Sequence, residues 1–287
     1  ALIQAIKIIM NSFYGVLGSS GCRFYNPKLA SSITRRGHQI INRSRKWIET
    51  QGYQVIYGDT DSLFVLLGPG VDEPEAQRSG RQLAHELNGY WRQTIEREFR
   101  LASFLEIEFE THYIRFLMPT IRGAETGSKK RYAGYVRNSK GANELIFKGL
   151  ESVRSDWTPL ARNFQRELYR RVFFDQPYAD YIKDLVSELR AGQLDDQLVY
   201  RKRLRRAIDE YRRNIPPHVQ AAKKLPNPGR RISYLITLNG PEPLSHRTAG
   251  IDYQHYIDRQ LAPAADSILH LLGDSFEQLT GNQMKLF

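Results

Sequence analysis

The stretch Tyr57-Gly58-Asp59-Thr60-Asp61-Ser62 places two aspartates two residues apart, between the apolar runs 53–57 and 62–67. These runs predict the strands of a short hairpin with the aspartates at its tip. Two carboxylates at a rigid tip cannot both face a core without a cation, because burying unpaired charge costs several kcal/mol. Hard oxygen ligands at this spacing suit Mg²⁺. The alternative is an exposed turn, since Asp is common in turns.

The charge of the whole chain favours a polyanionic partner. The 287 residues contain 42 Lys and Arg against 31 Asp and Glu, a net charge of +11. Such a balance is typical of proteins that bind nucleic acid or an anionic membrane surface. No apolar run approaches the ~20 residues that span a bilayer, and no amphipathic helix with a strongly apolar face stands at an end. The single cysteine, Cys22, excludes an internal disulfide and indicates a reducing compartment.

The elements around the hairpin predict an α+β fold. Residues 2–17 are apolar nearly all round, which is typical of a buried helix, apart from a polar stripe. The stripe consists of Gln4, Lys7, Asn11 and Tyr14. Further helices are expected at 29–51 and 75–97. Strands are expected at 104–110, 114–118, 130–137 and 145–150.

Helical patterns dominate from about residue 155 onward. Helices are expected at 159–174, 179–191, 195–211 and 253–272, with one strand at 232–238. The chain starts without Met and inside a helical pattern, so we expect a piece of a longer protein. The predicted divisions are 1–21, 22–155, 156–275 and a tail, 276–287.

Four motifs in order resemble those of family B DNA polymerases. Tyr-x-Asp-Thr-Asp-Ser at 57–62 is similar to the family's palm motif, and 7–15, KIIMNSFYG, to its fingers motif Lys-x3-Asn-Ser-x-Tyr-Gly. Residues 129–132, KKRY, resemble a basic motif near the primer, and 148–156, KGLESVRSD, the motif before the thumb. The resemblance implies the end of the fingers at 1–21, a palm with an antiparallel sheet and flanking helices at 22–155, and a mostly helical thumb at 156–275.

The resemblance also implies a template-directed DNA polymerase whose site contains two Mg²⁺ ions. Asp61 would be the direct metal ligand, and Asp59 beside it would act less directly. Lys7 would neutralise phosphate charge, Asn11 would donate to a phosphate or sugar oxygen, and Tyr14 would pack against the deoxynucleoside triphosphate. On the residues alone, the alternative is that Lys7 is a surface side chain whose stem lies along the helix and that Tyr14 is a core residue.

One part of the family's pattern is absent from these 287 residues. The motif Asp-x-x-Ser-Leu-Tyr-Pro-Ser, which supplies the other essential aspartate, is not found, nor are the proofreading carboxylates. We therefore expect the fragment itself to be inactive and its parent to polymerise DNA. The alternative is a non-catalytic, DNA-binding scaffold derived from a polymerase, although a scaffold has no need of Asp59 and Asp61.

Basic residues in three places predict contacts to primer–template DNA. Such contacts go to phosphates and give affinity without sequence specificity. The expected residues are Lys129, Lys130, Arg131, Tyr132, Lys148, Arg154, Arg205 and Arg206. A solvated surface is the alternative for each charge run, but 200–231 holds eleven basic residues against Asp209 and Glu210. The resemblance implies a bacterial cytoplasmic, nucleoid-associated protein.

The last five residues, QMKLF, resemble the peptide by which bacterial polymerases dock on the sliding clamp. Leu286 and Phe287 would fill an apolar pocket, and Gln283 would hydrogen-bond at its edge. A disordered terminus is the alternative.

Overall fold

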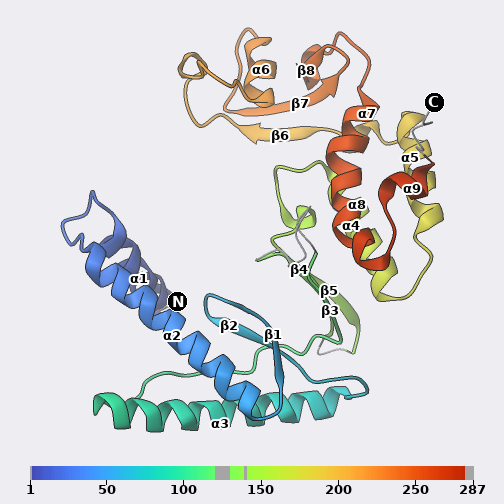
Figure 1. Cartoon of the computed structure of the whole chain (residues 1–287). Helices are drawn as coiled ribbons and strands as arrows, with labels where there is room; N and C mark the ends of the chain where they lie inside the picture. Colours follow the sequence, from blue (N-terminus) through green and yellow to red (C-terminus); the bar gives the residue numbers. More distant parts are fainter. Residues whose placement is uncertain (1, 120–129, 139–140, 282–287) are drawn as a thin grey trace, which may run out of the picture. The chain divides into compact units, whose positions relative to one another are not determined.

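The structure, a computed structural model, describes residues 2–119, 130–138 and 141–281. The chain divides into two compact units, the first ending at His112 and the second beginning at Tyr113 (Figure 1). Small antiparallel sheets alternate with helices in the described residues, so the α+β prediction is confirmed. The expected palm and thumb boundaries remain a prediction. No helix of the described residues has the length and apolar character to cross a membrane.

The first unit contains three helices and the predicted hairpin. Its elements are α1 (Leu2–Gly18), α2 (Pro27–Thr50), β1 (Gln54–Asp59), β2 (Ser62–Leu66) and α3 (Glu73–Phe99). The side chains of Asn26 and Asp72 cap α2 and α3 by accepting from backbone N–H groups of the first turn. Both helices begin with proline close behind the cap, where its missing N–H costs nothing.

The core of the first unit lies between α2, the hairpin and α3. Ile48, Val55, Leu87 and Trp91 are buried there. Trp91 Nε1 donates a hydrogen bond of 2.8 Å to the buried hydroxyl of Ser44, which joins α3 to α2. The hairpin is therefore attached to the core through β1.

The strand expected at 104–110 is absent. The segment is extended, but the Asn88 side chain bonds it: Asn88 Oδ1 accepts from Ile107 N at 2.9 Å and Nδ2 donates to Ile107 O at 2.7 Å. Alternate residues face the helix, which explains the strand-like pattern. The alternating pattern therefore correctly predicted that one side of the segment is buried. It did not predict that the hydrogen-bond partner would be the side chain of Asn88 on a helix in place of a neighbouring strand.

Helix α1 is exposed where its composition predicts burial. Phe13 is 62% exposed and Met10 is 65% exposed. In the described residues α1 packs on α2, for example through Tyr14 and Thr34. The expected burial is wrong for this unit because one neighbouring helix covers only part of a helix that is apolar all round.

The second unit contains two three-stranded antiparallel sheets and several helices. The first sheet has the order β3 (Arg115–Leu117), β4 (Tyr132–Arg137), β5 (Asn143–Lys148), and the second β6 (Tyr200–Arg203), β7 (Arg231–Thr237), β8 (Gly240–Pro243). The helices are α4 (Pro159–Phe173), α5 (Ala179–Arg190), α6 (Pro217–Lys223), α7 (Tyr253–Tyr256), α8 (Ala262–Leu269) and α9 (Phe276–Thr280).

Helix α4 lies at the centre of the second unit. Leu160, Phe164 and Leu168 are fully buried on it. The ring of Tyr169 meets Phe147 of β5 edge-on at 5.6 Å, so α4 packs against the first sheet. The same helix contacts α8 on the C-terminal side of the chain.

The helix expected at 195–211 is wrong, because this segment contains strand β6 between two short 3₁₀ turns. Tyr200 pairs with Tyr234 across β6 and β7, their rings stacked at 5.2 Å, and it also stacks on Tyr256 at 5.7 Å. Stacking and ladder pairing therefore outweigh the helix propensity of the arginines around Tyr200.

A π-helical turn, Ile257–Leu261, separates α7 from α8. It contains the buried Gln260, whose Oε1 accepts from Thr158 Oγ1 at 2.9 Å and from Thr158 N at 3.2 Å. Thr158 in turn caps α4. The turn thus connects two helices that are far apart in the sequence.

Candidate functional site

The two aspartates lie where the sequence predicts them, at the tip of the β1–β2 hairpin. Asp59 pairs with Ser62, and Asp61 N donates to Asp59 O at 2.6 Å across Thr60, whose φ of 52° closes the turn. Asp59 is half-buried and Asp61 is exposed. Hydroxyls from the turn donate to both carboxylates, Thr60 Oγ1 to Asp59 at 3.1 Å and Ser62 Oγ to Asp61 at 3.3 Å.

The residues of the tip suit one part of a magnesium site. Both side chains offer carboxylate oxygens, the ligands that Mg²⁺ prefers, and Mg²⁺ commonly takes one or two carboxylates together with substrate phosphates. No group of three or more His, Cys, Asp or Glu that could hold a metal lies in the part of the chain that the structure describes. Two carboxylates at the tip are compatible with a magnesium site in which substrate phosphates supply further oxygen ligands.

The fingers-like motif lies on α1. Lys7, Asn11 and Tyr14 are spaced i, i+4 and i+7, so they share one helix face. The side chains of Lys7 and Asn11 lie outside what the structure describes. The hydroxyls of Tyr14 and Thr34 are 2.8 Å apart, and Tyr14 is 48% exposed, so its ring is held by α2 and is not part of a core.

Two lysines predicted to contact DNA, Lys130 and Lys148, lie at one end of the β4–β5 ladder. Tyr132 pairs with Lys148, and Lys130 immediately precedes β4. Both lysines are exposed. Lys130 and Gly149 have positive φ of 64°, and a Cβ on Gly149 would lie 2.1 Å from Lys130 O, so the two backbones touch. Lys129 lies outside the described residues.

The other three predicted DNA contacts of this region are held by protein groups. Arg131 forms an ion pair with Glu151. The Arg154 guanidinium donates to both oxygens of Asp156 at 2.9 and 2.7 Å, and this hydrogen-bonded pairing lowers the pKa of Asp156. Tyr132 packs its ring at 5.2 Å from the Phe116 ring.

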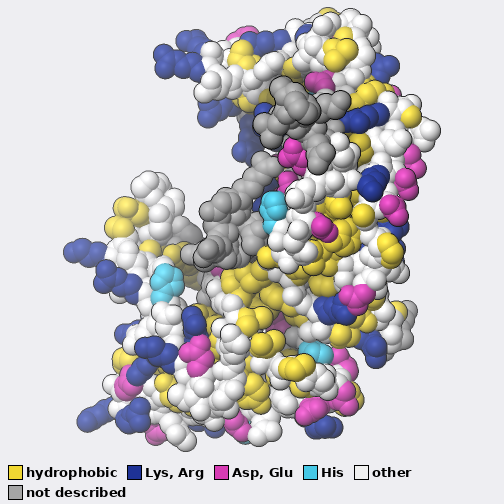
Figure 2. Space-filling model, turned by 45° about the vertical axis from the view of Figure 1, so that its right-hand side comes forward, with side chains coloured by type: hydrophobic (Ala, Val, Ile, Leu, Met, Phe, Trp, Pro, Cys, Tyr) yellow, Lys and Arg dark blue, Asp and Glu magenta, His cyan; other side chains and the backbone are white. Residues whose placement is uncertain are grey.

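The second sheet and α6 form a basic lobe, defined here as residues 200–243. Figure 2 shows dark-blue Lys and Arg side chains over this lobe, at the top of the view. Arg203 and Arg231 lie directly opposite each other in the β6–β7 ladder, both exposed. Like charges in opposite positions destabilise a ladder, so this surface suits an anion. Arg205 and Arg206 follow β6 and are exposed.

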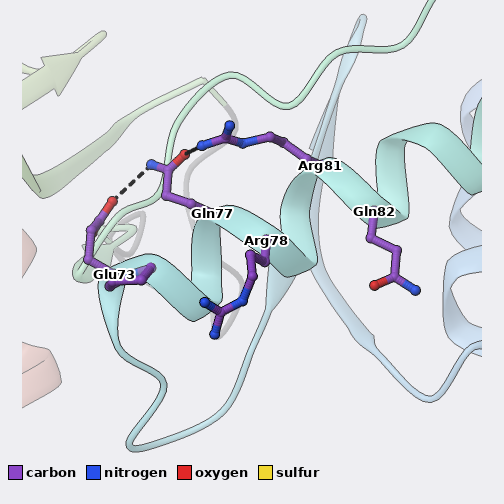
Figure 3. Close-up of a pocket in the computed structure, with 6 residues that line it drawn as sticks. Glu73, Gln77, Arg78, Arg81 and Gln82 are labelled. Carbon is purple, nitrogen blue, oxygen red and sulfur yellow. Dashed lines mark hydrogen bonds between the residues drawn. The ribbon is translucent and has the colours of Figure 1, made fainter.

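A shallow hollow on the first turns of α3 contains none of the predicted site residues. It is lined by Glu73, Pro74, Gln77, Arg78, Arg81 and Gln82. The Gln77 amide donates to Glu73 at 2.9 Å and accepts from Arg81 at 3.1 Å, as Figure 3 shows. These are contacts along one face of the helix, between residues four apart.

The residue that sequence reasoning missed is Gln165. It is fully buried on α4 and hydrogen-bonds Glu151, the partner of Arg131. A glutamine inside a helix belongs to no sequence motif. What could have indicated the role of Gln165 is that a polar residue occupies a position where the 3.6-residue pattern predicts an apolar core residue.

The chain belongs to DNA polymerase family B, whose model matches residues 3–272. The resemblance predicted from the four motifs is therefore confirmed. Among curated relatives, the chain is 52% identical over 298 residues to DNA polymerase II of Escherichia coli (strain K12), a match that covers all of this chain and 38% of that protein.

Archaeal relatives match at lower identity. The chain is 29% identical to DNA polymerase 1 of Pyrococcus abyssi (strain GE5 / Orsay), over 98% of this chain and 36% of that protein. It is 30% identical to the DNA polymerase of Pyrococcus horikoshii, over 96% of this chain and 22% of that protein. The chain thus spans well under half the length of these curated relatives.

Proposed function

We propose that this chain is part of a DNA-directed DNA polymerase that transfers deoxynucleotides to a primer on a template. The observation that carries the proposal is the carboxylate pair Asp59 and Asp61 at the hairpin tip of a family B chain. A tip attached to the core through β1 can hold two oxygen ligands in a fixed place.

In this proposal Asp61 holds Mg²⁺ and Asp59 supports it. The two ions of the complete site would lower the pKa of the primer 3′ hydroxyl and stabilise the charge on the leaving pyrophosphate. Tyr14, Lys7 and Asn11 would bind the incoming deoxynucleoside triphosphate from α1. The hydrogen bond between Tyr14 and Thr34 would fix the direction of the ring.

The second unit would hold the primer–template duplex. Lys130, Lys148 and the basic lobe offer exposed cations to phosphates, which give affinity that falls with salt. Lys129, Arg131, Tyr132 and Arg154 remain predicted contributors. A chain bound to chromosomal DNA would be found in the bacterial nucleoid.

The test is primer extension by the full-length protein. Asp61→Asn should reduce extension to background while leaving duplex affinity within about twofold, because the aspartate binds a metal and contributes little to phosphate binding. Asp180→Asn removes a carboxylate that is 86% exposed on α5 and should change neither. A polypeptide of the 287 residues alone should bind duplex without extending it.

Unreduced extension by Asp61→Asn would contradict the catalytic role. Duplex binding with no extension by the full-length wild type would instead favour the non-catalytic scaffold.

Duplex binding by the basic lobe has its own test. Replacing Arg205 and Arg206 together with serine should lower the slope of log affinity against log salt by about 1.8, since each lost phosphate contact removes about 0.9. Lys183→Ala on α5 is the matched control, because Lys183 is exposed in the same unit but outside the lobe. An unchanged slope in the double variant would exclude the lobe from the interface.

We also propose that Gln283, Leu286 and Phe287 bind the bacterial sliding clamp. These residues lie outside the described part of the chain, and the support is their sequence alone. Deleting the last five residues should abolish clamp binding in a pull-down and leave duplex affinity unchanged. Retained clamp binding would refute this proposal.

A further inference from the structure

A buried carboxylate lies directly behind the predicted primer-binding lysines. Glu151, in the 3₁₀ turn Glu151–Val153, is 7% exposed. One of its oxygens accepts from Arg131 and the other from Gln165 Nε2 at 2.7 Å. Gln165 Oε1 in turn accepts from Ser152 N at 2.7 Å, so α4 holds this turn through both atoms of one amide. A carboxylate in such a place is stable only while it stays paired.

Apart from Gln165, the groups buried next to Glu151 are neutral hydroxyls. The hydroxyl of Ser152 is buried and has no hydrogen-bond partner among the described residues. Burial, followed by the Glu151 charge, raises the pKa of Tyr169, so that hydroxyl stays neutral. Arg131 is the cation that forms a direct ion pair with Glu151, and the charge of Arg154 interacts with Glu151 without such a contact.

Arg131 is also part of the backbone contact that sets the position of Lys130. It stands between Lys130 and Tyr132, at the start of β4. A Cβ on Gly149 would lie 3.3 Å from Arg131 Cγ and 2.1 Å from Lys130 O. The side chain that pairs with Glu151 thus packs against the same glycine that the Lys130 carbonyl touches.

We propose that Arg131 is a positioning residue: its ion pair with buried Glu151 fixes the start of β4, so that the adjoining Lys130 reaches the primer–template phosphates while Arg131 itself contacts no DNA. The inference rests on the proposed duplex binding, and it reassigns a residue that the sequence predicts to touch DNA.

The two possible roles of Arg131 predict opposite effects of Glu151→Gln on duplex affinity. Removing a negative charge beside a DNA-binding surface, and freeing an arginine, should tighten binding if Arg131 contacts phosphate. If Arg131 positions Lys130, the same change releases the start of β4 and weakens binding. The substitution keeps the side-chain shape, and an amide can still bond Gln165.

The experiment measures duplex affinity of the full-length protein at several salt concentrations. Glu151→Gln should bind about 3–10-fold more weakly with a salt slope lower by about 0.9, as expected for one lost lysine contact. Lys130→Ala should weaken binding in the wild type but add nothing in the Glu151→Gln background, because coupled residues are not additive. Asp180→Asn, the control for loss of one negative charge, should leave the slope unchanged.

Tighter binding by Glu151→Gln, or full additivity with Lys130→Ala, overturns the inference. If Glu151→Gln shows no cooperative thermal transition, the swap Arg131→Glu with Glu151→Arg decides. If the swapped variant binds duplex within threefold of the wild-type affinity, the positioning role is supported. If its salt slope is lower by about 0.9, Arg131 contacts a phosphate directly and the inference is overturned. A wild type that binds no duplex would instead refute the proposed function.

Discussion

Replacing Gly149 with alanine should destabilise the second unit. The loss should be larger than that of the same replacement at Gly141, another turn glycine of the first sheet. Gly149 follows β5 with a φ of +64°, and an added Cβ would lie 2.1 Å from Lys130 O. That atom belongs to the backbone and cannot rotate away as a side chain does. Either Lys130 or Gly149 must move, and Lys130 has a positive φ of its own.

The size of the effect follows from two contributions. A non-glycine residue in the left-handed region costs about 1–2 kcal/mol. Forcing packed atoms apart adds about 1–3 kcal/mol. The free energy of unfolding should therefore fall by about 2–5 kcal/mol, which lowers Tm by about 4–20 °C for a unit of this size.

Thermal unfolding followed by circular dichroism measures this loss, with Gly141→Ala as the matched control. Gly141 lies in the turn that joins β4 to β5 and has a φ of +76°, but no atom of the described residues lies within 4 Å of its added Cβ. The control should lose only the backbone contribution of about 1–2 kcal/mol. Equal losses in the two variants would refute the close approach as the cause.

Ser44→Ala should cost about 1–3 kcal/mol in urea unfolding, because it leaves the buried Trp91 N–H unpaired; no loss would mean that water replaces the hydroxyl. Backbone and hydroxyl hydrogen bonds from Thr248 lower the pKa of Glu242 to about 2. The carboxylate therefore stabilises the fold above its ordinary pKa of 4.5 and loses that effect as pH falls toward about 2, so wild type and Glu242→Gln should converge in urea midpoint over this window. A constant difference would contradict this assignment. Arg231→Ser should lower the salt slope of duplex binding by about 0.9 while raising the urea midpoint, since it relieves a like-charge cross-strand pair; a lower midpoint would oppose that reading.

Local patterns predicted those parts of the fold that local interactions decide. The hairpin, α2, α3, α4 and α5 have strong periodicity and end at caps or turns, and all are found. The failures are segments whose partners are distant in sequence. The segment 104–110 bonds Asn88 in place of a strand, and 200–203 pairs with β7 because Tyr200 stacks on Tyr234.

The candidate site shows the same division. The place of Asp59 and Asp61 follows from the turn between two apolar strands, and the exposure of Lys130 and Lys148 follows from their position at a strand end. The ion pair of Arg131 does not follow from sequence. Its partner Glu151 is twenty residues away, and the pairing depends on α4 burying that carboxylate.

The number of residues in the π turn Ile257–Leu261 determines which face of α8 points to the core. A π turn holds one residue more than an α turn, so everything after it is rotated by about 100° relative to an unbroken helix. Deleting a single residue there would let α7 and α8 fuse into a regular helix, yet it would swing Ile268 and Leu269 off the core face. Insertions and deletions should accumulate in the connecting loops of the second unit and be purged from these five residues.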